Sequence, residues 1–223
     1  MKNKLIIFDI DDTLYNEIDY VKSGYKVISR YIEKKYNKKD IYKTLMSLFN
    51  TSSKNVFNRL FDKLNISYTK DDIMHLVDLY RNHVPDIKMN KETINALIEL
   101  RKNYKLAIVS DGNYNTQKIK CDSLNLEKYF DEVILTDKYG KEYWKPNKKA
   151  FEVLNSKFNI SYENMFYVGD NPNKDFYISV YGINTIRLYN KKGIYYNDKY
   201  KDDIKEKYCI NNIVDIIDIL KMR

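Results

Sequence analysis

One short stretch near the N-terminus constrains the fold more than any other part of the chain. Residues 5–8 are apolar and run directly into a group of polar side chains, namely Asp9, Asp11, Asp12 and Thr13. A buried strand that carries acids to the open edge of a parallel sheet has this form. Carboxylates so close together repel one another unless a cation lies among them, and Mg²⁺ prefers hard oxygen ligands. The stretch therefore predicts a strand that ends in a cation site, the alternative being an acidic turn with no further role.

The next segment contains helical patterns and no strand of convincing length. Apolar residues recur at helical spacing over residues 15–36, 41–49, 56–64 and 71–80. Thr69 or Asp71 is expected to cap the last of these helices. We therefore expect residues 16–85 to form an all-helical insertion or cap.

From residue 86 onward, strand and helix patterns alternate. The predicted strands cover residues 106–109, 133–135, 165–168 and 185–188, and the predicted helices cover residues 91–102, 116–124, 147–158 and 213–220. Such alternation is typical of a doubly wound parallel sheet. We predict an α/β protein with a Rossmann-like core, made of residues 1–15 and 86–223, and an inserted helical cap. A hydrophobic content of 43% is sufficient for a core of that size.

The net charge and the cysteines indicate which partners and which cellular compartment to expect. The net charge of +8 invites a nucleic-acid hypothesis, but the lysines are scattered along the chain and interleaved with acids. We therefore expect no specific nucleic-acid partner. Cys121 and Cys209 lie far apart and form no CxxC pattern, which favours a reducing compartment. No signal peptide or membrane span is recognisable, so a cytoplasmic protein without a membrane partner is expected, and its oligomeric state stays open.

Polar side chains follow two further predicted strands, and a lysine precedes a helix. The segments are Ser110-Asp111-Gly112, Lys145-Pro146 and the run from Gly169-Asp170 to Asp175. Because the carboxyl ends of parallel strands meet at one edge of a sheet, these groups are expected to converge on the acidic turn.

The complete set resembles the four motifs of the haloacid dehalogenase (HAD) superfamily, in the same order and over nearly the whole chain. The motifs are DxDxT at residues 9–13, the strand-terminal Ser110, Lys145 before a proline, and GDxxxxD ending at Asp175. The helical segment resembles the C1 cap of that superfamily. The chain is also similar to phosphatase-like members that have LY after the acidic turn, a VSDG-type second motif with Gln117 downstream, and WKP as the third motif.

This resemblance implies that Asp9 is the nucleophile and forms an aspartyl-phosphate. Asp11 would protonate the leaving oxygen and then deprotonate the attacking water, as a general acid and base. An acid at this position favours phosphate transfer over dehalogenation. The implied activity is a Mg²⁺-dependent phosphomonoesterase acting on a small phosphorylated metabolite, such as a sugar phosphate or a nucleoside monophosphate. A phosphomutase and a catalytically idle binding or regulatory module are the alternatives.

The resemblance also assigns the ligands of the metal and of the phosphate. Mg²⁺ would be held by the side chains of Asp9 and Asp170 and by the carbonyl of Asp11. Asp175 would either contact the metal through a water molecule or pair with Lys145. The phosphoryl group would be bound by the groups Ser110, Asp111 and Gly112, the last two through their amides, and by the charge of Lys145.

Other residues near these motifs are expected to shape the site. Thr13 is expected to brace the acidic turn through its hydroxyl, with Asp12 structural. Asp111 stands where many related phosphatases have Asn, which weakens phosphate binding unless its carboxylate points away. The expected specificity residues are Tyr15, Asn16 and Arg59, although Arg59 has the alternative of an exposed ion pair with Asp62 or Asp71.

Overall fold

A computed structural model describes residues 2–221 and contains one six-stranded parallel sheet. The strand order is β3-β2-β1-β4-β5-β6, the order of a doubly wound Rossmann-like sheet. The strands are β1 (Leu5–Phe8), β2 (Lys105–Ser110), β3 (Glu132–Leu135), β4 (Met165–Gly169), β5 (Asn184–Leu188) and β6 (Tyr208–Ile210). The predicted fold class is confirmed. The strand β6 was not predicted, because it has three residues and lies at the sheet edge, where an apolar run is not required.

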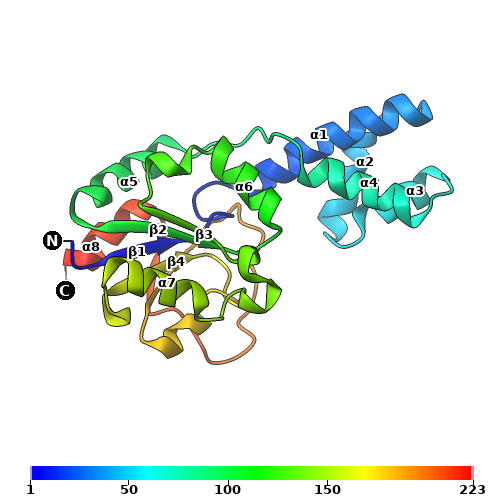
Figure 1. The fold of residues 1–223 in the computed structure, drawn as a ribbon. Helices are drawn as coiled ribbons and strands as arrows, with labels where there is room; N and C mark the ends of the chain where they lie inside the picture. The colour runs from blue at the N-terminus through cyan, green and yellow to red at the C-terminus, as the bar shows by residue number, and fades with distance from the viewer. Residues whose placement is uncertain (1, 222–223) are drawn as a thin grey trace. The chain divides into compact units, whose positions relative to one another are not determined.

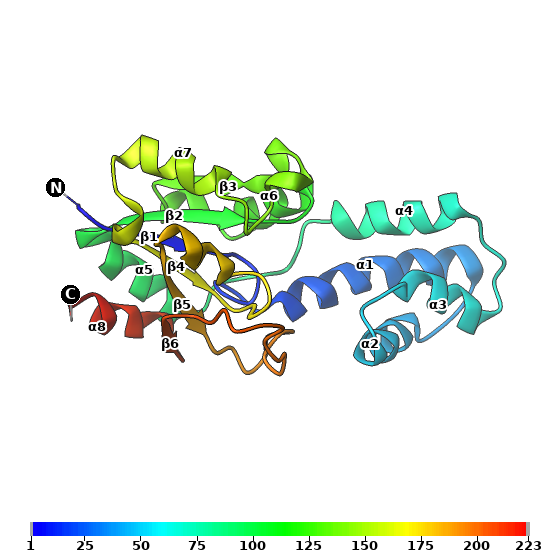
Figure 2. The ribbon, with the colours of Figure 1, turned by 90° about the horizontal axis from the view of Figure 1, so that it is seen from below.

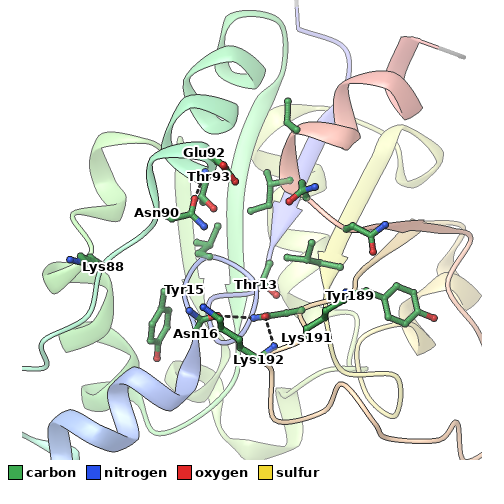
Figure 3. Close-up of a pocket in the computed structure, with 17 residues that line it drawn as sticks. Thr13, Tyr15, Asn16, Lys88, Asn90, Glu92, Thr93, Tyr189, Lys191 and Lys192 are labelled. Atoms are coloured by element: carbon green, nitrogen blue, oxygen red, sulfur yellow. Dashed lines mark hydrogen bonds between the residues drawn. The ribbon is translucent and has the colours of Figure 1, made fainter.

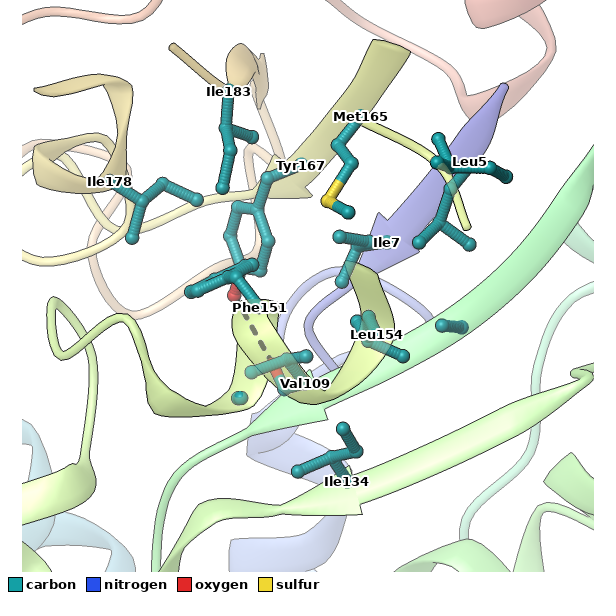
Figure 4. Close-up of a cluster of buried hydrophobic side chains, with 13 residues drawn as sticks. Leu5, Ile7, Val109, Ile134, Phe151, Leu154, Met165, Tyr167, Ile178 and Ile183 are labelled. Carbon is teal, nitrogen blue, oxygen red and sulfur yellow. Dashed lines mark hydrogen bonds between the residues drawn. The ribbon is translucent and has the colours of Figure 1, made fainter. Parts of the chain in front are cut away.

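The first strand lies between β2 and β4 and is buried on both faces. All four of its residues are fully buried, which explains why its sequence is a continuous apolar run rather than an alternating one. On one face, Leu5 and Ile7 pack with Phe151 and Leu154 of helix α7 (Lys149–Phe158), as Figure 4 shows. On the other face, the ring of Phe8 packs edge-to-face against Phe130 at 5.8 Å. These layers fix the end of β1 in space.

Three further helices belong to this sheet-containing unit (Figure 1): α5 (Lys91–Asn103), α6 (Tyr114–Ser123) and α8 (Ile216–Lys221). The helix α6 is capped by Asn113, whose side chain accepts a hydrogen bond from the backbone of Thr116. Short 3₁₀ segments connect the elements and are η1 (Leu126–Lys128), η2 (Thr136–Tyr139), η3 (Lys141–Tyr143), η4 (Tyr162–Asn164), η5 (Tyr177–Tyr181) and η6 (Ile213–Asp215). None of the helices in residues 2–221 has the length and apolar character needed to cross a membrane.

A second compact unit spans Asp19–Asp86 and is entirely helical (Figure 2). Its helices are α1 (Glu17–Tyr36), α2 (Ile41–Thr51), α3 (Val56–Leu64) and α4 (Lys70–Arg81), the first of which starts in the sheet-containing unit. Thr69 caps α4 through a reciprocal capping box with Asp72. Within this unit Gly24 lies against the ring of Tyr80, and an added Cβ would come within 2.4 Å of that ring. A larger residue at position 24 would therefore have to displace the Tyr80 ring.

Candidate active site

The predicted motif residues meet at the carboxyl ends of β1, β2 and β4. Phe8 is in register with Ile108 of β2 and Val168 of β4, so the next residues of the three strands emerge at one edge. The backbone N–H of Asp9 continues the ladder by donating to the carbonyl of Val168 at 2.9 Å. The order of the strands changes direction at β1, and such switch points are where doubly wound sheets bind ligands.

Asp9 is held by donors on both carboxylate oxygens. Its Oδ1 accepts from the Ser110 hydroxyl at 2.7 Å and the Ile10 amide at 2.8 Å, and its Oδ2 accepts from Lys145 Nζ at 2.8 Å. Burial alone would raise the pKa of Asp9, but the charges of Lys145 and Lys174 outweigh burial and hold the pKa below its usual value. The carboxylate is therefore ionised and oriented at neutral pH.

Lys145 is fully buried, and each of its three N–H bonds has an acceptor. These are Asp9, the Oδ1 of Asp175 at 2.9 Å, and the hydroxyl of Tyr167. Burial lowers the pKa of Lys145, but the carboxylates of Asp175 and Asp9 raise it well above the usual value. Of the two contacts considered for Asp175, the structure contains the pair with Lys145. Tyr167 was not predicted as a site residue, because its position in an apolar strand indicates a core residue, and its ring does belong to the core. Its hydroxyl lies 3.3 Å from the carbonyl of Val109 (Figure 4).

Asp11 is held by three side chains, two of them from α6. Lys120 Nζ lies 2.7 Å and 2.8 Å from its two oxygens, and Gln117 Nε2 donates to Oδ2 at 3.1 Å. The Tyr15 hydroxyl donates to Oδ1, and Gln117 also donates to the Ser110 hydroxyl at 2.9 Å. Lys120 was missed by the sequence analysis. The available signal was its position three residues after Gln117, which places both polar side chains on one face of the helix.

Asp170 carries an unsatisfied acceptor that suits a cation. Its Oδ2 is buried and has no hydrogen-bond partner among the described residues. Burial, and then the charges of Asp175, Asp12 and Asp9, raise the pKa of Asp170 well above its usual value. No group of three or more His, Cys, Asp or Glu side chains in residues 2–221 is arranged to hold a metal ion. The carboxylates of Asp9 and Asp170 and the Asp11 carbonyl are nevertheless hard oxygen donors of the kind that Mg²⁺ accepts once waters complete the set, so their chemistry suits this ion.

The carboxylate of Asp111 is engaged by neighbouring groups. It accepts from the Thr136 hydroxyl and, at 3.1 Å, from the Lys145 backbone amide, and its Oδ2 lies 2.6 Å from Lys174 Nζ. The extra acid is therefore paired with a cation of its own, so its negative charge is compensated. Gly112 follows with a φ of 124°, a conformation that favours glycine.

The acidic turn is braced by Asp12 rather than by Thr13. The prediction for Thr13 was wrong, because its hydroxyl is buried without a hydrogen-bond partner in the described part of the chain. The carboxylate of Asp12 accepts from the amides of Glu17 at 2.8 Å and Ile194 at 2.7 Å, and Asn190 donates to its carbonyl at 3.1 Å. Burial raises the pKa of Asp12 to about 6. Asp12 thus ties the loop after β5 to the turn.

A cavity of about 590 Å³ lies beside this turn (Figure 3). Thr13, Tyr15 and Asn16 line one part of it, and the start of α5 and residues 188–192 line another. None of the carboxylates of the motifs lines it. Of the expected specificity residues, Asn16 faces this cavity and Tyr15 also contacts Asp11.

Arg59 lies in the helical unit, where its side chain binds backbone carbonyls of nearby residues in the same unit. Its guanidinium donates to the carbonyl of Lys54 at 3.1 Å and to that of Ser52. The alternative ion pair with Asp62 or Asp71 is absent from the salt bridges found among residues 2–221. The carbonyls that follow the end of α2 carry partial negative charge and take the place of a carboxylate.

Comparisons with known proteins identify the family of the chain. Residues 6–188 match the sequence profile described as haloacid dehalogenase-like hydrolase. Glyceraldehyde 3-phosphate phosphatase of Methanocaldococcus jannaschii is 26% identical, covering 98% of this chain and 97% of the relative. Pyrophosphatase PpaX of Bacillus mycoides is 26% identical, covering 99% and 98%.

A solved structure shows the same fold. The YfnB protein of Bacillus subtilis, bound to magnesium, has a TM-score of 0.68 and 18% identity, covering 99% of each chain. The profile match spans most of the present chain. The chain is therefore an enzyme of the haloacid dehalogenase-like hydrolase family.

Proposed function

We propose that the enzyme is a Mg²⁺-dependent phosphomonoesterase that acts on a small phosphorylated metabolite through an aspartyl-phosphate on Asp9. One observation supports this more than any other: Asp9 is ionised and held between Lys145 and Ser110, with Asp11 two residues away. A carboxylate in this state needs no base to become a nucleophile. The names of the two relatives, which refer to glyceraldehyde 3-phosphate and pyrophosphate, support a small substrate.

In the first step an oxygen of Asp9 attacks phosphorus and the bond from phosphorus to the ester oxygen breaks. Asp11, protonated in the substrate-bound enzyme, gives its proton to the departing oxygen, which leaves as an alcohol. In the second step water attacks the phosphorus of the aspartyl-phosphate and Asp11 takes the proton of that water. Inorganic phosphate leaves, and Asp9 and Asp11 return to their starting states.

The remaining residues bind and orient the phosphoryl group. Ser110 offers its hydroxyl, and the amides of Asp111 and Gly112 lie just before the N-terminus of α6. Lys145 supplies a buried positive charge where negative charge develops. Asp9, Asp170 and the Asp11 carbonyl would hold Mg²⁺, which when bound neutralises repulsion between the nucleophile and the substrate dianion.

The test is phosphate release from a panel of phosphate esters. The panel contains 4-nitrophenyl phosphate, glyceraldehyde 3-phosphate, glycerol 3-phosphate, ribose 5-phosphate and AMP, with pyrophosphate added, each with Mg²⁺ or EDTA. We expect activity that needs Mg²⁺, is abolished in Asp9→Asn and is unchanged in the exposed control Asp62→Asn. A folded wild type that is inert with Mg²⁺ across the panel would overturn the proposal and favour a mutase or a binding module.

A further inference from the structure

Lys120 is a buried lysine that the proposed reaction does not yet explain. Lys120 and Lys145 are the two buried lysines among the described residues, and Lys120 is 4% exposed. Burying an ammonium is costly unless an opposite charge and hydrogen bonds compensate it. Its Nζ lies 2.7 Å and 2.8 Å from the two oxygens of Asp11, so the compensating charge is the expected general acid and base.

The contacts of Lys120 are part of one hydrogen-bonded network. Gln117, one helical turn earlier, donates one N–H to Asp11 and the other to the Ser110 hydroxyl. Ser110 in turn donates to Asp9 at 2.7 Å. One face of α6 therefore fixes the orientation of both carboxylates relative to each other. Gln117 contacts one oxygen of Asp11, whereas Lys120 contacts both and so restrains rotation of the whole carboxyl group.

We propose that Lys120 is the positioning residue for Asp11 and that it controls how well this acid reaches the leaving oxygen. The proposal rests on the phosphatase function proposed above. Lys120 transfers no proton itself: Asp11, once protonated in the substrate-bound enzyme, passes that proton to the ester oxygen as the P–O bond breaks, while Lys120 holds the Asp11 carboxyl group in place. General acid–base catalysis depends on such alignment, because the donor must lie within hydrogen-bond reach of the oxygen it protonates.

The alternative is that Lys120 only stabilises the fold. The two explanations predict a different dependence of the activity loss on the leaving group of the substrate. A nitrophenolate leaves with little help from an acid, whereas the alkoxide of an alkyl phosphate needs a proton. Loss of positioning should therefore harm alkyl phosphates selectively, and loss of stability should affect both substrates to the same extent.

The experiment compares kcat/KM for 4-nitrophenyl phosphate and for the best alkyl phosphate of the panel, since kcat/KM reports formation of the aspartyl-phosphate. In Lys120→Met we expect a decrease of roughly 10- to 100-fold for the alkyl phosphate and of less than about threefold for the nitrophenyl ester. Lys120→Arg should recover part of the alkyl phosphatase activity. The control is Lys118→Met, an exposed lysine on the same helix, which should leave both values unchanged.

A double-mutant cycle with Asp11→Asn shows whether Lys120 acts through Asp11. We expect Lys120→Met to cause no further loss once Asp11 is replaced. Equal losses for both substrates, or a full further loss in the Asp11→Asn background, would overturn the proposal. If Lys120→Met is unfolded in circular dichroism, the leaving-group comparison is made with Lys120→Gln under the same criterion. An inactive wild type would instead refute the phosphatase function on which the proposal rests.

Discussion

Replacing Lys145 by methionine tests how much the buried ion pairs of Lys145 contribute to stability. The measured quantity is the free energy of unfolding, which requires no substrate. Lys145 is fully buried and lies 2.8 Å from Asp9 and 2.9 Å from Asp175, whose side chain is also fully buried. Removing one partner of a buried ion pair leaves an uncompensated charge and costs about 3–5 kcal/mol of unfolding free energy. We therefore expect Lys145→Met to lose about this much stability at pH 8.

The same loss should become smaller in acid. In the wild type the pKa of Asp9 is held below its ordinary value of 3.8, so Asp9 contributes stability that is lost only as pH falls below that value. Burial already raises the pKa of Asp175 in the wild type, although Lys145 opposes this. In Lys145→Met that opposing charge is lost, so burial and the mutual repulsion of Asp9 and Asp175 should raise the folded-state pKa of at least one of them further. The penalty is then present at high pH and decreases as pH falls through the raised pKa. The deficit relative to the wild type should shrink by at least about 1 kcal/mol between pH 8 and pH 5.

The assay is urea unfolding monitored by tryptophan fluorescence. Trp144 is the single tryptophan of the chain and belongs to the sheet-containing unit, so its signal reports that unit. Lys148→Met serves as the control, because Lys148 makes an exposed pair with Glu152 and its loss should matter little. An unchanged stability of Lys145→Met at pH 8, or a deficit that grows in acid, would refute this reasoning.

Three further changes test neighbouring contacts. Tyr167→Phe keeps the ring in the core but removes an acceptor of Lys145, so kcat should fall by roughly threefold to tenfold while thermal stability changes little; an unchanged kcat would contradict this. Lys174→Met leaves the Asp111 carboxylate without its cation, so KM for a phosphate dianion should rise about tenfold, and adding Asp111→Asn should restore it. Gly112→Ala, at a φ of 124°, should cost about 1–3 kcal/mol in urea unfolding, and a neutral effect would show that the turn relaxes.

The sequence predicted the parts of the fold that depend on strong local patterns. The continuous apolar runs of β1 and β4 and the helical spacing of residues 15–80 are such patterns, and they correspond to the observed elements. The strand β6 forms because its backbone pairs with β5 at the sheet edge, a tertiary contact that three residues cannot encode on their own.

The sequence likewise predicted some residues of the candidate site and missed others. Asp9, Ser110, Lys145 and Asp170 follow strands or precede a helix, so their positions carried a signal. Lys120 carried little signal, because a lysine in a helix of a lysine-rich chain is ordinarily exposed, and only the fold shows that it faces a carboxylate.

Thr13 and Asp12 are adjacent polar residues, and the fold decides which of them braces the turn. A threonine hydroxyl and an aspartate carboxylate are both suited to bracing a turn, and sequence does not show which backbone amides come within reach. The amides that need an acceptor belong to Glu17 and Ile194, and the second is distant in the chain. The carboxylate of Asp12 reaches both, and Thr13 is left without a partner in the described structure.

The central claim, that Asp9 becomes phosphorylated, is tested most directly by rapid acid quenching. The enzyme is mixed with Mg²⁺ and a ³²P-labelled substrate from the panel, quenched within milliseconds and digested for peptide mapping. The account predicts a label on the peptide that contains Asp9, sensitive to hydroxylamine as an acyl phosphate is, and no label in Asp9→Asn. Rapid phosphate release without a labelled protein, or a label on Ser110 instead, would contradict it.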